Sequence, residues 1–459
     1  RPTASAPTPR TPTPARPEPN GAGGHGARGH GAPGNGAAIA PAVEVPDETW
    51  DVSKFPEVEA LGQRFEMAKL MGLDNPYFPV HAGTARDTSV VNGKEMIHFS
   101  GYNYLGFSGR PEVVEAAQRA AETFGTSVSA SRIASGERPI HREFERGIAD
   151  HLGVEDAILY VGGHATNVTT VGHLLGKEDL VIHDSLIHDS VFQGVKLSGA
   201  KRRPFRHNDM DALEQILAQT RTSFRRVLIA AEGIYSMDGD ICDLPRLIEL
   251  KKKYRCLLLV DEAHSIGVLG HQGRGVGHHF PGVDPNEVDM WMGTLSKSFA
   301  SVGGYIAGRK KLVEYLKYSA PGFVYSVGLA PPNAAAALEA LRLMQAEPET
   351  VERLRENSRF FLRVSKELGL DTGPAVGAAV VPIIVGDSIL CLELSAALGE
   401  KGINVQPIVY PAVDNESARL RFFISALHSE EQLRYAAETT KSTLEELRAE
   451  RDGGARAQL

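Results

Sequence analysis

Short apolar runs, each followed by a stretch long enough for a helix, fill the middle of the chain. They occupy residues 157–161, 180–182, 227–231, 257–260, 290–292 and 305–307. Unbroken apolar runs are typical of strands buried on both faces of a parallel sheet, because the connecting helices cover those faces. We therefore predict an α/β fold whose large domain is built around a mainly parallel sheet.

The pattern changes toward both ends of the chain. Apolar residues spaced three or four apart predict one amphipathic helix from Phe55 to Met71. Asn92–Gly93 lies between two short apolar pairs and predicts a β-hairpin, because this dipeptide suits a type I′ turn. Beyond Pro331–Pro332 a helix-rich stretch leads to apolar runs at 380–385, 403–405 and 420–424. This part predicts a smaller, C-terminal α+β domain.

The amino-acid composition predicts the first domain boundary, near residue 46. Residues 1–46 hold ten of the 27 prolines and have no Val, Ile, Leu, Met or aromatic residue before Ile39. Such a stretch cannot bury enough apolar surface to offset the entropy of ordering it, so we expect a disordered linker. The predicted organisation is this linker, an N-terminal helix and hairpin at 47–95, the large domain at 96–335, the small C-terminal domain at 336–451 and a tail at 452–459.

Charge and composition argue against several classes of function. No apolar run approaches the roughly 18 residues of a membrane-spanning helix, so we expect no membrane association. The net charge of −8 argues against a nucleic-acid partner. The three cysteines are scattered and form neither a disulfide framework nor a CxxC metal site, so we expect a cytoplasmic protein without a bound metal.

Polar residues follow several of the predicted strands at the point where each strand ends. The carboxyl ends of parallel strands meet at one edge of the sheet, where α/β proteins bind their ligands. We therefore expect these residues to share a site. They are Gly162, Gly163 and His164 after the first run, Asp261 and His264 after the fourth, and Thr294, Ser296 and Lys297 after the fifth.

Each of these features also has an ordinary structural interpretation. A Gly-Gly turn is more often a plain connection than an anion site, and a carboxylate at a strand end can serve a structural ion pair. A single lysine is usually a solvated surface charge. Metal binding by Asp261 and His264, or by His183 and His188, lacks a third ligand nearby in the sequence.

One cofactor would use the whole set. A glycine turn and hydroxyl groups could hold a phosphate, Asp261 could pair with a protonated aromatic nitrogen, and Lys297 could form an imine. Pyridoxal 5′-phosphate (PLP) carries a phosphate, a pyridine nitrogen and an aldehyde. The sequence therefore predicts a PLP site.

Seven ordered motifs resemble the α-oxoamine synthase family of fold-type I PLP enzymes, over residues from about 75 to 440. General aminotransferases share the Asp and the Lys, but the motifs at 232–240 and 293–299 are more typical of the synthases. The motifs are GYNYLG at 101–106, SRIASG at 131–136 with His141, LIHDS at 186–190, EGIYSMDGD at 232–240, VDEAH at 260–264, GTLSKSF at 293–299 and RLR at 419–421.

The resemblance implies roles for the matched positions. Four are predicted to be catalytic: Lys297 forming the imine with the cofactor, His188 stacking on its ring, Asp261 pairing with the ring nitrogen and His264 bonding the phenolic oxygen. Further cofactor contacts would come from Gly163, His164, Glu232, Ser236, Thr294 and Ser296, and substrate contacts from Arg421 and Asn103. A guanidinium suits a substrate carboxylate because it can hydrogen-bond both oxygens.

The implied reaction is a decarboxylative condensation of an amino acid with an acyl thioester, giving an α-amino ketone, carbon dioxide and a free thiol. Lys297 would act as the general base at the amino acid's Cα. The alternatives are a class I/II aminotransferase and a non-catalytic partner subunit, and the presence of Lys297, Asp261, His188 and His264 argues against the latter. The resemblance also implies a homodimer.

The acyl donor could be a CoA ester or an acyl carrier protein. The sequence begins at Arg1 and carries the flexible 1–46 stretch, so we expect a domain excised from a polyketide-type synthase. A flexible tether raises the effective concentration of an attached partner. We therefore expect the donor to arrive on a carrier protein.

Overall fold

The computed structural model describes residues 45–70 and 75–457. The predicted linker therefore lies outside the described residues, apart from its last two positions. The chain divides into two compact units, Arg1–Phe65 and Glu66–Leu459. No helix among the described residues is both long enough and apolar enough to cross a membrane.

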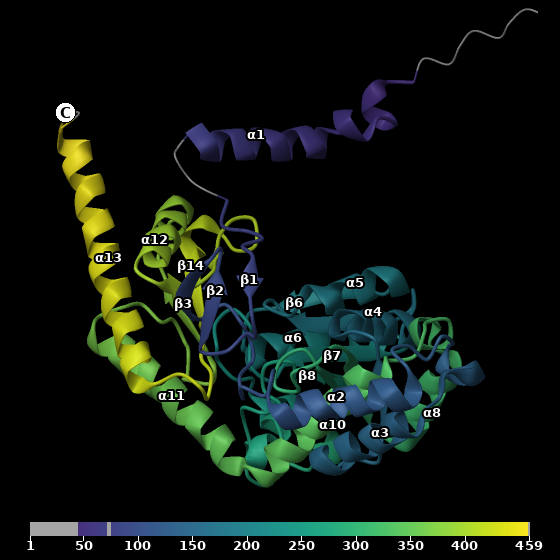
Figure 1. Cartoon of the computed structure of the whole chain (residues 1–459). Coiled ribbons are helices and arrows are strands. Elements are labelled where there is room, and N and C mark those ends of the chain that lie inside the picture. The colour runs from purple at the N-terminus through teal and green to yellow at the C-terminus, as the bar shows by residue number, and fades with distance from the viewer. Residues whose placement is uncertain (1–44, 71–74, 458–459) are drawn as a thin grey trace, which may run out of the picture. The chain divides into compact units, whose positions relative to one another are not determined.

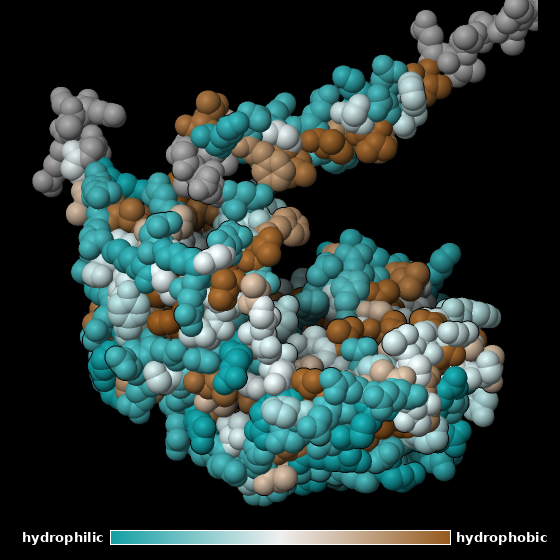
Figure 2. All heavy atoms as spheres, viewed as in Figure 1, coloured by the Kyte–Doolittle hydropathy of each residue, from teal (hydrophilic) through white to brown (hydrophobic). Residues whose placement is uncertain are grey.

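The N-terminal helix is present as predicted. Helix α1 spans Pro56–Leu70, and short 3-10 turns at Asp47–Thr49 and Val52–Lys54 precede it. Its large apolar side chains, among them Val58, Leu61 and Phe65, are exposed. Figure 2 shows apolar atoms gathered along one side of this helix. The helix thus carries its apolar side chains along one side.

The core of the second unit is a seven-stranded sheet (Figure 1). Its spatial order is β4-β10-β9-β8-β7-β5-β6, and only β10 runs antiparallel to its neighbours. The mainly parallel sheet is therefore confirmed. Its strands are β4 (Asp156–Tyr160), β5 (Leu180–Asp184), β6 (Lys201–Phe205), β7 (Val227–Glu232), β8 (Leu257–Asp261), β9 (Met290–Thr294) and β10 (Gly304–Gly308).

The sequence pattern missed β6. This strand lies at the edge of the sheet, and its residues Lys201, Arg202, Arg203 and Pro204 are exposed. Charged residues and proline are common on edge strands, because an edge needs no continuous apolar run and must not pair with other chains. The strand therefore lacks the apolar signature that identified the other six.

Helices cover both faces of the sheet. Successive residues of β7 point to opposite faces, so that Ile229 packs with α6 and α7 while Leu228 packs with α4 and α5. One face also carries α2, α3 and α10, and the other carries α8. The helices are α2 (Pro111–Phe124), α3 (Pro139–Leu152), α4 (Gly163–Leu174), α5 (Asp189–Ser198), α6 (Met210–Thr220), α7 (Leu244–Tyr254), α8 (Lys310–Ser319) and α10 (Pro331–Ala346).

The C-terminal part is α+β, as predicted. A three-stranded antiparallel sheet, β11-β14-β13, packs with three helices around Phe361, Leu394 and Phe422. Helix α13 continues beyond residue 451, where we placed the start of a tail. The elements are β11 (Val380–Ile384), β13 (Pro407–Ile408), β14 (Arg419–Phe423), α11 (Pro348–Glu367), α12 (Ser388–Glu400) and α13 (Glu430–Ala457).

The predicted hairpin is also present. Strands β2 (Thr88–Val91) and β3 (Lys94–His98) are joined by Asn92 and Gly93, whose φ angles of 49° and 85° are those of a two-residue hairpin turn. The same sheet contains β1 (His81–Ala82) and β12 (Ile403–Asn404), in the order β1-β2-β3-β12. The hairpin thus shares a sheet with the C-terminal part of the chain.

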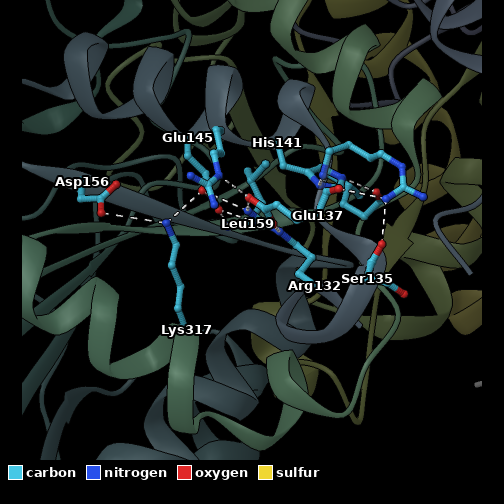
Figure 3. A network of polar contacts seen from close by, with 11 residues as sticks. Arg132, Ser135, Glu137, His141, Glu145, Asp156, Leu159 and Lys317 are labelled. Atoms are coloured by element: carbon cyan, nitrogen blue, oxygen red, sulfur yellow. Dashed lines mark hydrogen bonds and ion pairs between the residues drawn. The ribbon is translucent and has the colours of Figure 1, made fainter. Parts of the chain in front are cut away.

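A buried ionic network fastens the SRIASG motif to the large sheet (Figure 3). The side chains of Arg132 and Glu145 are each only 3% exposed, and Nη1 of Arg132 donates to Oε1 of Glu145 at 2.5 Å. The same carboxylate accepts a 3.0 Å bond from the backbone N–H of Leu159 in β4 and a 2.9 Å bond from Nζ of Lys317 in α8. Glu145 therefore ties four segments together.

We expect Glu145→Ala to lower the free energy of unfolding by about 3–5 kcal/mol, because it leaves the Arg132 charge buried without this partner. Glu143→Ala is the matched control on the same helix. Its carboxylate pairs with Arg342 where both side chains are about half exposed, so the expected cost is below about 1 kcal/mol. Urea unfolding followed by circular dichroism measures both. Equal losses in the two variants would contradict the role assigned to Glu145.

Candidate active site

The polar residues predicted at the strand ends line one cavity of about 380 Å³. Strands β7, β8 and β9 end in Glu232, Asp261 and Thr294, and β14 of the C-terminal sheet adds Arg421. The structure thus brings together the predicted residues Gly163, His164, His188, Glu232, Ser236, Asp261, His264, Thr294, Ser296, Lys297 and Arg421.

Asn103 does not line this cavity. Its Nδ2 donates to the carbonyl of Ala85 at 2.8 Å, and its Oδ1 accepts from the backbone N–H of Ser108 at 3.2 Å. Both ends of the amide are therefore used within the protein, one by the segment before β2 and one by the turn that follows Asn103. The neighbouring Tyr102 lines the cavity instead.

The Asp261 carboxylate is held by hydrogen bonds rather than by a cation. Its side chain is buried, Oδ1 accepts from the backbone N–H of Ala263 at 2.9 Å, and Oδ2 accepts from Nδ2 of Asn167 at 2.8 Å. It makes no ion pair with any other described residue. A buried carboxylate is strongly stabilised by a positive partner. The site therefore favours a ligand that brings a cation or a protonated nitrogen to Asp261.

Asn167 links Asp261 to His188 through the hydroxyl of Ser190. Its Nδ2 also donates to Oγ of Ser190 at 2.9 Å, and that hydroxyl lies 2.7 Å from Nδ1 of His188. The backbone N–H of Ser190 donates to the same ring nitrogen at 3.3 Å. Nδ1 thus acts as the acceptor, which places the ring proton on Nε2. Burial lowers the pKa of His188 and favours this neutral form.

His264 is the second imidazole in the cavity wall. Its Nδ1 lies 2.7 Å from the hydroxyl of the buried Tyr104, and its ring stacks on Phe423 at a centroid distance of 6.1 Å. Burial lowers the pKa of His264 well below its ordinary value, and the neighbouring Lys297 charge acts in the same direction. The ring is therefore a neutral hydrogen-bonding group at pH 7.

Lys297 and Glu232 have pKa values that move toward each other. Burial lowers the pKa of Lys297 to about 8, although Asp261 and Glu232 partly oppose this shift. Burial and the charge of Asp261 raise the pKa of Glu232 to about 8. Near neutral pH, Lys297 has a far larger uncharged fraction than an ordinary lysine, and Glu232 is mostly protonated. Only the uncharged amine can act as a nucleophile or a base.

One end of the cavity suits an anion. The backbone N–H groups at the start of α4 are unpaired within the helix and attract negative charge. A Cβ on Gly163 would lie 2.7 Å from Oγ1 of Thr294, so no larger residue fits this close approach. The hydroxyls of Thr294 and Ser296 lie 2.9 Å apart beside it. Helix start and hydroxyls together can donate several hydrogen bonds to a phosphate.

Arg421 supplies a second place for an anion. Its Nη1 donates to the carbonyl of Ser236 at 3.1 Å, and its guanidinium carbon lies 4.7 Å from the centroid of the Phe423 ring. Its Nε is buried and has no partner among the described residues, and the same holds for Oε1 of Glu232 and Oδ1 of Asn167. Buried polar atoms normally have partners. These three atoms indicate that the cavity takes a polar ligand.

The loop from Glu232 to Asp240 is anchored by charges at its far end. His207 lies between Asp184 and Asp240, with 2.9 Å contacts from Nδ1 and Nε2, and Asp238 pairs with Arg419. Burial alone would lower the pKa of His207, but the hydrogen bonds to the two carboxylates raise it to about 10. Both ring nitrogens therefore donate, which leaves the ring no lone pair for a metal ion.

Several lining residues were not predicted as site residues. They are Tyr102, Asn167, Ser190, Met237, Ala263, Met292 and Phe423. Asn167 had a usable signal, because it lies four positions after Gly163 and so faces the same side of helix α4. Tyr102 and Phe423 had none, since their contact with the cavity depends on how the C-terminal sheet packs beside the large one.

We expect the contribution of Glu232 to the stability of the ligand-free chain to fall as the pH rises from about 4.5 to about 8, while buried histidines such as His264, whose pKa burial lowers, act in the opposite direction below about pH 6.5. In this interval the unfolded state releases the Glu232 proton while the folded state keeps it, so deprotonation favours unfolding by up to a few kcal/mol. Glu232→Gln should lose most of this pH dependence, and urea midpoints at pH 5, 6, 7 and 8 measure it. Parallel curves for both proteins would contradict the raised pKa.

Comparisons with known proteins show the family of the chain. The model of the family described as "Aminotransferase class I and II" matches residues 94–439. An 8-amino-7-oxononanoate synthase of Fervidobacterium nodosum is 41% identical over 350 residues, which cover 76% of this chain and 88% of that protein.

Solved structures give the same result. A serine palmitoyltransferase of S. paucimobilis with a bound PLP–myriocin aldimine has a TM-score of 0.81 and 28% identity, covering 86% of this chain and 98% of that one. An 8-amino-7-oxononanoate synthase of Francisella tularensis has a TM-score of 0.67 and 26% identity, covering 76% of this chain and 98% of that one. The chain therefore belongs to the class I and II aminotransferase family and, within it, to the α-oxoamine synthases with the fold-type I architecture.

Proposed function

We propose that the chain condenses an amino acid with an acyl thioester in a PLP-dependent reaction that releases carbon dioxide and free thiol and yields an α-amino ketone. The observation that carries this proposal is the position of Lys297 in a cavity that also holds the buried Asp261 carboxylate and the Gly163 anion site. Relatives named 8-amino-7-oxononanoate synthase and serine palmitoyltransferase support it.

The residues present fit PLP. Lys297 would hold the aldehyde carbon, Asp261 the ring nitrogen, His188 one face of the ring and His264 the phenolic oxygen. The phosphate would lie at Gly163, His164, Thr294 and Ser296, where Gly163 permits the close approach described above. When bound, PLP would supply an electron sink that stabilises negative charge at the Cα of the amino acid.

The protein groups act on charge and protons. Asn167 and the Ala263 N–H hold the Asp261 carboxylate in place, so that it can keep a proton on the ring nitrogen. Lys297, with its pKa of about 8, can take a proton from Cα at neutral pH and return it. Arg421 has free donors for the substrate carboxylate. The protonated Glu232 can donate a hydrogen bond beside them.

A second cavity of about 560 Å³ offers room for the acyl group. Its walls include Leu186, Ile187, Phe192 and Ala412, and it shares His188, Ser236 and Met237 with the first cavity. An acyl thioester in this cavity would lie next to the site proposed for the amino acid, because the two cavities share these residues. The small side chain of Ala412 leaves space at this wall.

We also propose that the enzyme is a cytoplasmic homodimer and that its acyl donor arrives on a carrier protein. The side chains of Tyr318, Tyr325 and Val327, which are about half exposed or more, support a second subunit. All three cysteines are unbridged, which suits a reducing compartment. The proposal includes that the chain is one domain of a polyketide-type synthase.

An aminotransferase is the second candidate, because the family model describes that class. It would carry the amino group to a keto acid and accumulate pyridoxamine phosphate, whereas the condensation needs no keto acid. A non-catalytic subunit has less support, since Lys297, Asp261, His188 and His264 all line the cavity.

We expect the PLP-loaded enzyme, given a panel of amino acids and acyl thioesters, to release thiol and carbon dioxide in equal amounts for at least one pair. Thiol is measured with a chromogenic disulfide. Lys297→Ala should reduce the rate at least about a thousandfold, because it removes both the cofactor attachment and the base. Accumulation of pyridoxamine phosphate without thiol or carbon dioxide would instead establish the aminotransferase.

A further inference from the structure

We propose that strand β6 and the C-terminal end of helix α5 form the docking surface for an acidic acyl carrier protein. The inference rests on the proposed function and adds to it the place where the donor lands. We call this surface the basic edge, and define it by Lys196 and Leu197 of α5 and Lys201, Arg202 and Arg203 of β6. In Figure 1 the labels α5 and β6 mark this end of the large sheet.

The basic edge concentrates positive charge on a protein of net charge −8. Its four cations are exposed, and none of them forms an ion pair with a carboxylate of the described residues. The next cation along the chain, Arg206, is different, because its Nη2 lies 2.7 Å from Oδ2 of Asp209. Unpaired cations on consecutive strand positions repel one another unless an acidic partner covers them.

The basic edge reaches the second cavity through an aromatic ring. The guanidinium carbon of Arg202 lies 3.8 Å from the ring centroid of Phe192, and Nζ of Lys196 lies 4.7 Å from the same centroid. Arg202 and Phe192 both line the second cavity, which shares His188 and Ser236 with the active site. A thioester arm that enters beside Arg202 would therefore lie against the residues that separate it from the active site.

The arrangement favours a protein partner over the phosphates of free CoA. Successive strand residues point to opposite sides, so Lys201 and Arg203 lie on the side away from Arg202. Of the four cations only Arg202 lines the cavity. A ligand inside the cavity could reach Arg202 alone, whereas a protein that lies along the exposed edge of β6 could contact cations on both sides of the strand. Leu197, which is 67% exposed, would add an apolar contact to such an interface.

A simpler reason for the charges is protection of the edge strand. Lys, Arg and Pro on an edge prevent pairing with other chains. That reason accounts for Lys201 and Pro204, but it does not require an arginine in the wall of a cavity that shares lining residues with the active site. Edge protection and carrier docking predict different effects of charge reversal on the rate with a carrier-bound donor.

The test compares two double variants of the PLP-loaded enzyme. Lys201→Glu/Arg203→Glu reverses two charges of the basic edge that do not line either cavity. Arg309→Glu/Lys311→Glu is the matched control, with two exposed cations at the start of α8, which packs on β4 at the opposite edge of the sheet. The same acyl group is offered on an acidic phosphopantetheinylated carrier protein, on CoA and on N-acetylcysteamine.

We expect kcat/KM with the carrier protein to fall at least about tenfold in the basic-edge variant at low salt, since long-range attraction mainly speeds association. The N-acetylcysteamine ester should react unchanged, the CoA ester should lose much less, and the control variant should lose nothing with any donor. Unchanged kcat/KM with the carrier would overturn the proposal in favour of edge protection. An equal fall with CoA would overturn it in favour of a phosphate site.

A failure of the proposed function is distinguishable from a failure of docking. If the wild-type enzyme releases no thiol from any of the three donors, the condensation itself is wrong. Docking is then decided by fluorescence anisotropy with the labelled carrier protein as the probe. Binding to the wild type and the control variant, but not to the basic-edge variant, would support the surface, and equal binding to all three or to none would refute it.

Discussion

The site depends on one carboxylate that is buried without an ion-pair partner among the residues that the structure describes. Asp261 ends a central strand, where its charge would be costly unless something compensates it. The protein provides only part of that compensation, through Asn167 and the Ala263 N–H. The charged form of Lys297 adds to it, and a ligand with a protonated nitrogen would complete it, which is why Asp261 is informative about function.

The sheet explains how the other groups come to surround this carboxylate. Strands β7, β8 and β9 are parallel neighbours, so Glu232, Asp261 and Thr294 lie at one edge although they are far apart in the sequence. Helix α4 starts at the same edge and presents Gly163 and Asn167 together. These groups shift one another's pKa values. In a site that excludes water, the charge of Asp261 raises the pKa of Glu232 and partly offsets the lowering of the Lys297 pKa by burial.

Much of this could be predicted from the sequence, for physical reasons. Strands such as Val227–Glu232 are buried on both faces, and continuous burial leaves a clear apolar run. Edge strand β6 carries no such run and was missed. Among the site residues, those directly after a strand were predictable because the strand end fixes their position. The motif position Asn103 does not line the cavity, since its amide bonds Ala85 and Ser108.

We propose that Lys297, beside Asp261, holds the cofactor covalently. The most direct measurement is borohydride reduction of the PLP-loaded enzyme followed by peptide mass mapping, with Lys297→Ala as the control. The account predicts a coloured protein whose visible absorbance disappears on reduction, leaving one pyridoxyl group on the peptide that contains Lys297 and none in the variant. A label on a different lysine, or equal labelling of the variant, would contradict it.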